Sequence, residues 1–193
     1  HFANLRMDHA RALLRWYRKH GRTFPWRSGK LDPYVVLVSE IMLQQTQTSR
    51  VSEALPRFLR HFPTVFDLAR AGNGEIIRQW QGMGYNSRAL RLRDAAKAIV
   101  LEHDGVIPSS PEILLSLPGV GPYTSAAVAC FAFNTRVVVL DVNVRRVYSR
   151  LVKRQKYTTD VEPDEVLTRF AESVIPQRTS SQWHHAVMDL GAT

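Results

Sequence analysis

Apolar positions recur along this chain with a helical period, and segments of this kind follow one another closely. Gly or Pro separates nearly every pair of segments, as expected where short helices end. The pattern predicts helices at about 5–20, 34–46, 50–61, 64–71, 75–81, 87–102, 111–117, 123–133, 142–151, 163–175 and 181–190, with polar links at 22–33 and 153–160. We therefore predict an all-α protein of about ten short helices, packed as one compact or two-lobed body.

One segment is ambiguous between helix and strand. The run from Tyr34 to Thr46 reads YVVLVSEIMLQQT, and its early valines favour a strand. Its length, the lack of a partner strand nearby and the Leu-Gln-Gln sequence at its end favour a helix. We predict a buried helix.

Two helix starts carry local signals. Thr64 and Asp67 have the spacing of a capping box, in which each residue satisfies an amide of the other. Ser110 followed by Pro111 offers an N-cap and a first-turn proline for the helix at 111–117.

Composition and charge narrow the class of protein. Hydrophobic residues make up 45% of the 193 residues and charged residues 22%, which is the balance of a globular protein. The single cysteine, Cys130, excludes an intrachain disulfide, and no apolar run reaches bilayer-spanning length. The net charge of +9 favours a polyanionic partner, although an anionic membrane surface or simple solubility would explain it too.

A glycine-rich turn at 117–123, LPGVGPY, joins two predicted helices. The glycines let a phosphate approach the free amides at the start of the second helix, where the helix dipole favours negative charge. The alternative is an ordinary tight turn between helices.

Two carboxylates stand in unusual settings. Asp141 follows an apolar stretch and precedes Asn143 and two arginines; it either N-caps the next helix, or is oriented by Asn143 at a cleft, or does both. Glu40 lies inside an uncharged run from Tyr34 to Gln47. Burial there requires either a partner for Glu40 or a raised proton affinity, and the second condition suits a proton donor. The alternative is a satisfied structural carboxylate.

Seven motifs in a fixed order carry a family resemblance. They are FPWR at 24–27, DPY at 32–34, SEIMLQQTQ at 39–47, QGMGYNSRA at 81–89, LPGVGPYTSAAV at 117–128, LDVNVRRV at 140–147 and MDLGA at 188–192. Together they resemble the helix-hairpin-helix DNA glycosylases of the endonuclease III superfamily. The match is closest to the MutY-type enzymes, which remove adenine mispaired with 8-oxoguanine or guanine.

The resemblance implies a helix-hairpin-helix glycosylase fold with two helical lobes and the active site in the cleft between them. One lobe is a six-helix, barrel-like body at 24–133, which includes the hairpin at about 111–133. The other combines 1–23 with 134–193.

The resemblance also implies catalytic roles. Glu40 protonates the adenine ring as general acid, while Asp141 faces the sugar and stabilises or traps its oxocarbenium form. Tyr123 and Asn143 support Asp141. Because bifunctional relatives carry a Schiff-base lysine where this chain has Tyr123, the resemblance implies a monofunctional enzyme that leaves an abasic site.

Base flipping requires residues that enter the duplex. By resemblance Gln45 inserts near the orphaned base and Tyr85 wedges between bases beside Met83, the alternative being ordinary packing. The other residues expected at the substrate or DNA are Trp26, Arg27, Leu43, Gln44, Thr46, Gly119, Val120, Gly121, Arg145 and Arg146. The carbonyls of Leu115, Leu117 and Val120 match positions that hold a monovalent cation.

Other polar residues carry weaker signals. Adjacent histidines at 184 and 185 point to different helix faces, so we expect packing or surface roles for them rather than a metal site. Arg88, Arg91 and Arg93 would either meet phosphates or solvate a helix face.

Relatives of this type continue into four cysteines that hold a [4Fe–4S] cluster, and then into a domain that reads 8-oxoguanine. With Cys130 alone, this chain is expected to be a catalytic core without a cofactor of its own. We expect a monomer that binds duplex DNA with mismatched or oxidised pairs and no membrane. It would act inside the cell with the DNA, in a bacterial nucleoid and cytoplasm, or in a nucleus or mitochondrion. The alternatives are a thymine glycosylase for T·G mismatches and an inactive mismatch-binding fragment.

Overall fold

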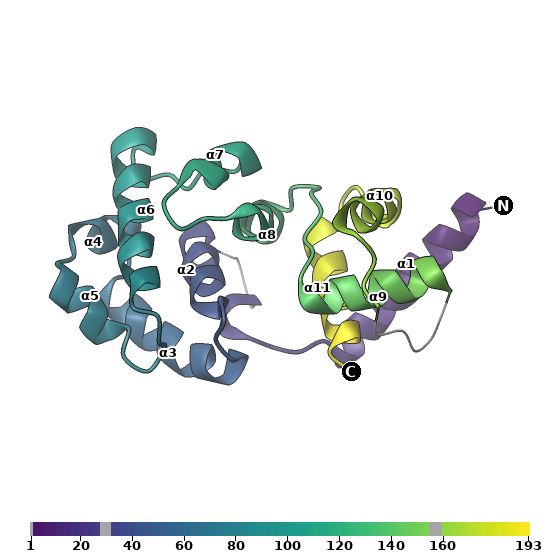
Figure 1. Cartoon of the computed structure of the whole chain (residues 1–193), viewed down its shortest axis with the longest axis horizontal. Coiled ribbons are helices and arrows are strands. Elements are labelled where there is room, and N and C mark those ends of the chain that lie inside the picture. The colour runs from purple at the N-terminus through teal and green to yellow at the C-terminus, as the bar shows by residue number, and fades with distance from the viewer. Residues whose placement is uncertain (1, 28–31, 155–159) are drawn as a thin grey trace. The chain divides into compact units, whose positions relative to one another are not determined.

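The structure is a computed structural model that describes residues 2–27, 32–154 and 160–193 (Figure 1). In these ranges every regular element is helical, which confirms the predicted all-α class. The elements are α1 Phe2–His20, the 3-10 turn η1 Pro25–Arg27, α2 Pro33–Leu43, α3 Thr48–His61, α4 Val65–Arg70, α5 Asn73–Gln79, α6 Ser87–His103, α7 Pro111–Ser116, α8 Pro122–Phe133, α9 Val142–Lys153, α10 Asp164–Val174 and α11 Ser180–Gly191. Parts of the two predicted links, 28–31 and 155–159, lie outside the described residues.

The ambiguous segment is a helix, as predicted. Asp32 caps α2, because its carboxylate accepts a hydrogen bond of 2.9 Å from the Tyr34 amide, and Pro33 occupies the first turn. Val36 and Val38 are buried within the helix, so tertiary packing overrides their preference for strands. The capping box of Thr64 and Asp67 is also confirmed.

The chain divides into two compact units. The hairpin unit is Thr23–Phe133, and the terminal unit combines the residues up to Arg22 with those from Asn134 on. In the hairpin unit α2 packs against α3, α6, α8 and η1, while α4 and α5 pack against α6, and α7 against α8. α2 is therefore the inner helix of this unit (Figure 1).

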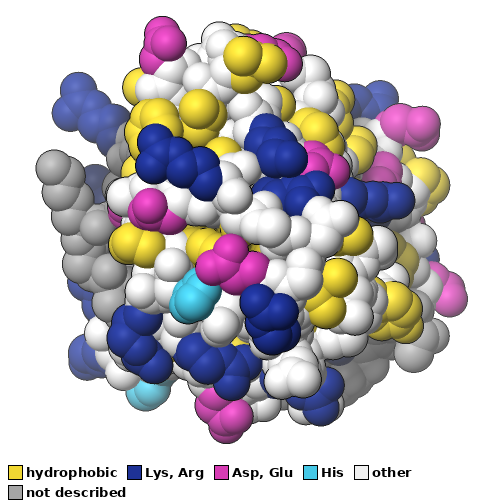
Figure 2. Space-filling model, turned by 90° about the vertical axis from the view of Figure 1, so that its left-hand side faces the viewer, with side chains coloured by type: hydrophobic (Ala, Val, Ile, Leu, Met, Phe, Trp, Pro, Cys, Tyr) yellow, Lys and Arg dark blue, Asp and Glu magenta, His cyan; other side chains and the backbone are white. Residues whose placement is uncertain are grey.

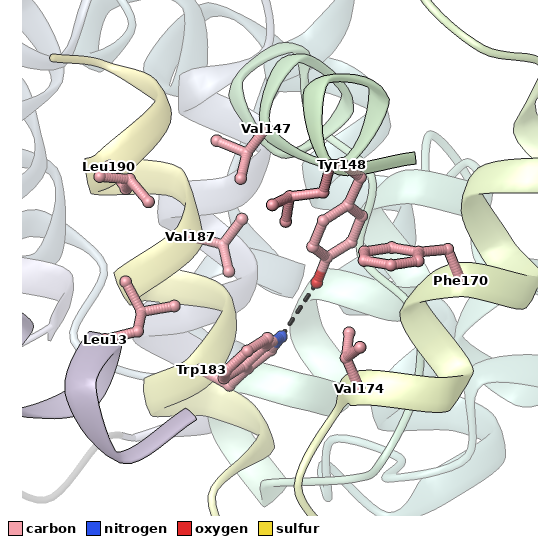
Figure 3. Close-up of a pocket in the computed structure, with 9 residues that line it drawn as sticks. Leu13, Val147, Tyr148, Phe170, Val174, Trp183, Val187 and Leu190 are labelled. Atoms are coloured by element: carbon pink, nitrogen blue, oxygen red, sulfur yellow. Dashed lines mark hydrogen bonds between the residues drawn. The ribbon is translucent and has the colours of Figure 1, made fainter. Parts of the chain in front are cut away.

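The terminal unit is built on α11, which packs against α1 and α9, while α10 packs against α9. These helices leave an apolar pocket of about 440 Å³ (Figure 3). Within it the Trp183 indole donates a 2.9 Å hydrogen bond to the Tyr148 hydroxyl, and Phe170 packs edge-on against Tyr148. Among the described residues, its lining is Leu13, Val147, Tyr148, Leu151, Phe170, Val174, Trp183, Val187 and Leu190, none of which carries a carboxylate.

The histidine pair has a packing role, as expected. His184 is fully buried; its Nε2 accepts the Val139 amide at 3.1 Å, and its Nδ1 lies 2.9 Å from the Ser180 carbonyl. These contacts require a neutral ring with the proton on Nδ1. Among the described residues no group of three or more His, Cys, Asp or Glu is placed to hold a metal ion. None of the helices in these ranges is long and apolar enough to cross a membrane.

Because His184 is buried, we predict that the free energy of unfolding falls at acid pH. Burial lowers the pKa of His184 from 6.5 to about 4, so between these values the unfolded chain takes up a proton that the folded chain refuses. Stability is unaffected by this group above pH 6.5, falls as the pH drops, and has lost up to about 3 kcal/mol below pH 4. Urea unfolding at several pH values will measure this, and His184→Gln should remove that part of the slope. An unchanged slope in the variant would contradict the assignment.

The packing around Gly191 leaves no room for a side chain. A Cβ at Gly191 would lie 2.5 Å from the Asn143 carbonyl oxygen and 2.8 Å from its carbonyl carbon, so α9 approaches α11 closely only because residue 191 is glycine. Gly191→Ala should lower the free energy of unfolding by about 1–3 kcal/mol. The matched control, Gly74→Ala, places its Cβ 3.4 Å from a flexible Arg78 end in α5 and should stabilise by up to about 1 kcal/mol. Equal effects of the two substitutions would refute the close approach.

Candidate functional site

Glu40 lies on the buried helix α2. Its side chain is only 5% exposed, and its neighbours Leu37, Val38 and Ile41 are almost completely buried. Glu40 is therefore a buried carboxyl group on an apolar helix, as the sequence predicted. α2 is held on several sides, so the position of the group is fixed by the core of the hairpin unit.

The end of α2 is bonded to the start of α8. The Gln44 side-chain amide donates a 3.1 Å hydrogen bond to the Thr124 hydroxyl, next to Tyr123. Tyr123 is 37% exposed at the first turn of α8. The helix that carries Glu40 is therefore bonded to, and packed against, the helix whose first turn carries Tyr123.

The predicted glycine turn joins α7 to α8. The Val120 amide donates to the Leu117 carbonyl at 3.1 Å, and Gly119 has φ +76°. A Cβ at Gly119 would lie 2.7 Å from the Cβ of Arg91, so both the backbone and the space require glycine. The first helical bond of α8 runs from the Ser125 amide to the Gly121 carbonyl, which leaves the amides before it at the open end of the helix.

Gln45 and Tyr85 are the two exposed residues with unusual backbones beside this site. Gln45 has φ +55° and Tyr85 φ +46°, and the Tyr85 side chain is 67% exposed. Met83, two residues before Tyr85, is buried, so its side chain does not face solvent.

Trp26 and Arg27 form the η1 turn, which packs against α2. Trp26 is buried and stacks on Phe24 with ring centroids 4.8 Å apart. The Arg27 guanidinium lies 5.0 Å from the centre of the Phe24 ring. Phe24 thus orders both residues beside α2.

In the terminal unit, Asp141 caps α9. One carboxylate oxygen accepts the Val144 amide at 2.7 Å, and the other accepts the Asn143 side-chain amide at 3.2 Å. The capping role and the orientation by Asn143 therefore coexist. Asp141 is partly exposed.

The two arginines after Asp141 have protein partners. Arg145 forms an ion pair with Asp164 of α10, with a 2.8 Å contact, and Arg146 donates a 2.5 Å hydrogen bond to the Gly191 carbonyl. Both side chains are only partly exposed, and both anchor α9 to its neighbours. The predicted phosphate contacts would compete with these bonds.

The exposed position predicted for Arg88 is wrong. Arg88 was expected to meet phosphates or solvent, but it is only 8% exposed and bonds to backbone carbonyls. The missed signal is its spacing, since Arg88 shares the buried face of α6 with Leu92, Ala95 and Ile99. A basic residue on the apolar face of a helix is therefore a candidate for a buried side chain that donates several hydrogen bonds.

Asp189 of the MDLGA motif is a second buried charged residue with several partners, and the sequence did not predict this role for it. It is 2% exposed, accepts the Arg22 amide at 2.7 Å and forms an ion pair with the Arg22 guanidinium at 2.8 Å. These bonds tie the residues after α1 to α11.

The charge of one face is mixed. On the face shown in Figure 2, basic side chains are spread among acidic and apolar ones. The candidate site therefore rests on the residues above and not on the charge of this face.

The comparisons with known proteins agree with this arrangement. The adenine DNA glycosylase of Mycobacterium tuberculosis is 42% identical over 184 residues, which are 94% of this chain and 60% of that protein. The adenine DNA glycosylase of Homo sapiens is 36% identical over 190 residues, 94% of this chain and 35% of that protein. This chain thus spans 60% or less of the length of these relatives.

Solved structures share the fold. A thermostable thymine-DNA glycosylase matches with a TM-score of 0.88 at 29% identity, over 99% of this chain and 88% of that one. A trapped endonuclease III–DNA covalent intermediate matches in fold with a TM-score of 0.76 at 19% identity, over 93% of this chain and 81% of that one. The family model of HhH-GPD superfamily base excision DNA repair proteins matches residues 38–175. With the fold, the glycine hairpin and this match in agreement, the chain belongs to the HhH-GPD superfamily of base excision DNA repair proteins.

Proposed function

We propose that this chain is the catalytic core of a monofunctional adenine DNA glycosylase. It hydrolyses the N-glycosidic bond of adenine mispaired with 8-oxoguanine or guanine, acts as a monomer on duplex DNA, and leaves an abasic site. The relatives that are adenine DNA glycosylases support the target base. The observation that carries the proposal is Glu40, a carboxyl group buried in an apolar helix one turn before Gln44 and Gln45.

The chemistry requires an acid for the base and a negative charge for the sugar. As the bond from C1′ to the adenine ring breaks, its electron pair goes to the base, and Glu40 supplies a proton to a ring nitrogen. The sugar develops oxocarbenium character, which the Asp141 carboxylate stabilises. Water adds to C1′, its surplus proton goes to solvent, and Glu40 regains a proton from solvent.

Asp141 is held in one orientation at the start of α9. Its carboxylate accepts two hydrogen bonds, from the Val144 amide and from the Asn143 side chain. Asn143 itself is fixed by the close approach of Gly191. Glu40 is therefore buried within a helix, whereas Asp141 is held by hydrogen bonds at the start of one.

DNA engagement is assigned to several parts of the chain. Gln45 and Tyr85 enter the duplex, and the amides at the start of α8 bind a backbone phosphate next to the flipped nucleotide. Trp26 and Arg27 border the adenine pocket. The carbonyls of Leu115, Leu117 and Val120 bind a monovalent cation beside that phosphate.

An iron–sulfur cluster does not fit this chain's own residues. Cys130 is its only cysteine and is buried in α8, whereas a [4Fe–4S] cluster needs four thiolates. No step above involves a cluster.

Thymine in a T·G mismatch is the second candidate target, favoured by the TM-score of 0.88 with a thymine-DNA glycosylase. Gln44, Gln45 and Glu40 favour adenine, since thymine departs as an anion with less need of a proton on its ring. Duplexes with A·8-oxoguanine, A·G and T·G, treated with alkali to cut abasic sites, distinguish the two targets. A fragment that only binds mismatches would shift all three duplexes in a gel without forming abasic sites.

The two carboxylates give a direct prediction. Glu40→Gln should lower the single-turnover rate of adenine release by about 10²–10⁴-fold, because glutamine keeps the shape but cannot donate the proton. Asp141→Asn should lower it by about 10²–10³-fold, while asparagine still caps α9. Alkaline cleavage after single turnover measures both rates, and a gel-shift assay should find DNA binding retained.

The matched control is Glu102→Gln, because Glu102 is exposed on α6. Its rate should equal that of the wild type. If Glu40→Gln also releases adenine at the wild-type rate, Glu40 is not the proton donor.

Tyr123 gives a second prediction, on the type of product. Tyrosine has no amine for a Schiff base, so borohydride should trap no protein–DNA adduct at this position, and strands should remain intact until alkali is added. A trapped adduct that disappears in Tyr123→Phe would contradict the monofunctional assignment.

A further inference from the structure

Arg88 joins the two loops that carry Gln45 and Tyr85. Its Nη1 donates to the carbonyls of Ile41 and Met42, both at 3.1 Å, and to the Gln44 carbonyl at the end of α2. Its Nη2 donates to the Met83 carbonyl at 2.8 Å, the Gly84 carbonyl at 3.1 Å and the Thr46 hydroxyl at 3.1 Å. One planar guanidinium thus bonds to both loops at once.

These bonds satisfy groups that the backbone cannot satisfy by itself. The last carbonyls of a helix lack amide partners, and a cation at this end is favoured by the helix dipole. Arg88 meets both needs for α2. Its plane is further confined by Trp80, whose ring centre lies 5.5 Å from the guanidinium carbon.

Both loops hold a residue in a backbone conformation that it would rarely adopt alone. Gln45 and Tyr85 are not glycines, yet both have positive φ. Such residues keep this conformation only where their surroundings enforce it. Arg88 bonds on both sides of Gln45, through the Gln44 carbonyl and the Thr46 hydroxyl, and to the Gly84 carbonyl directly before Tyr85.

The exposed Tyr85 ring is also in reach of this cation. Its centre lies 5.8 Å from the Arg88 guanidinium carbon. Arg88 therefore sits beneath a pair of exposed side chains without being exposed itself.

We propose that Arg88 is a positioning residue that fixes Gln45 and Tyr85 as one preformed wedge, so that both enter the duplex in a single step. This inference rests on the proposed function, in which the target adenine leaves the base stack. Because the two loops are already ordered in a preformed wedge, no free energy of DNA binding is lost in ordering them. Without it, flipping becomes slow, while the chemistry on a base already out of the stack is little changed.

The test compares a stacked and an unstacked target. One duplex carries adenine opposite 8-oxoguanine between normal neighbours; the other carries stable tetrahydrofuran spacers on both sides of the adenine, which remove its stacking partners. Arg88→Lys keeps the charge but lacks the planar fork. It should lower single-turnover adenine release about tenfold to a hundredfold on the stacked duplex, and less than about threefold on the spacer duplex. Arg93→Lys is the matched control, since Arg93 pairs with Asp94 on the same helix, and should change neither rate.

A mutant cycle tests whether Arg88 acts through the wedge. In a chain that already carries Gln45→Ala and Tyr85→Ala, Arg88→Lys should lower the rate on the stacked duplex by less than about twofold. Equal losses on both duplexes, or full additivity in the cycle, would show that Arg88 only stabilises the fold. If Arg88→Lys does not fold, Thr46→Val removes one of the bonds and should give a smaller loss, again confined to the stacked duplex.

A readout without catalysis keeps this inference separate from the proposed function. 2-Aminopurine at the target position brightens when it leaves the stack, and wild-type protein should raise its fluorescence faster than Arg88→Lys. If no adenine is released by the wild type but this difference persists, the glycosylase assignment fails and the wedge stands. Equal fluorescence rates for the two proteins would overturn the wedge.

Discussion

The buried C-terminal end of α2 is the constraint on which the hairpin unit depends. The last carbonyls of α2 need donors from outside the helix, and the Thr46 amide supplies one of them, to the Leu43 carbonyl at 3.3 Å. Arg88 of α6 supplies others, and the Gln44 side chain binds Thr124 of α8. These bonds fix α2 between two other helices, so the position of Glu40 and the shape of the adjoining turns follow from the same contacts.

In the terminal unit, the backbone amides at the start of a helix likewise need partners. The amides at the beginning of α9 are capped by Asp141, and Arg146 bonds to the Gly191 carbonyl at the end of α11. Because residue 191 has no side chain, Asn143 lies against α11 and directs its amide to Asp141. In both units, a candidate catalytic carboxylate is therefore held by the contacts that also complete a helix end.

The helices and their caps could be predicted from the sequence because their signals are local. Thr64 and Asp67 bond to each other over three residues, and the turn at Gly119 is visible in the glycines themselves. Partners far apart in the chain left no such signal: Arg88 bonds to carbonyls more than forty positions away, and Asp189 to Arg22. For Glu40 and Asp141, spacing and burial alone left structural and catalytic interpretations open, and only the family motifs favoured chemistry.

In the proposed mechanism, Glu40 gives a proton to the departing base. The most direct measurement is single-turnover release of a base that already carries a positive charge, N7-methyladenine, compared with adenine at the same position. The defect of Glu40→Gln should shrink from about a hundredfold or more on adenine to less than about fivefold on the methylated base, while the defect of Asp141→Asn should persist. A Glu40→Gln defect of the same size on both bases would contradict the proposed mechanism.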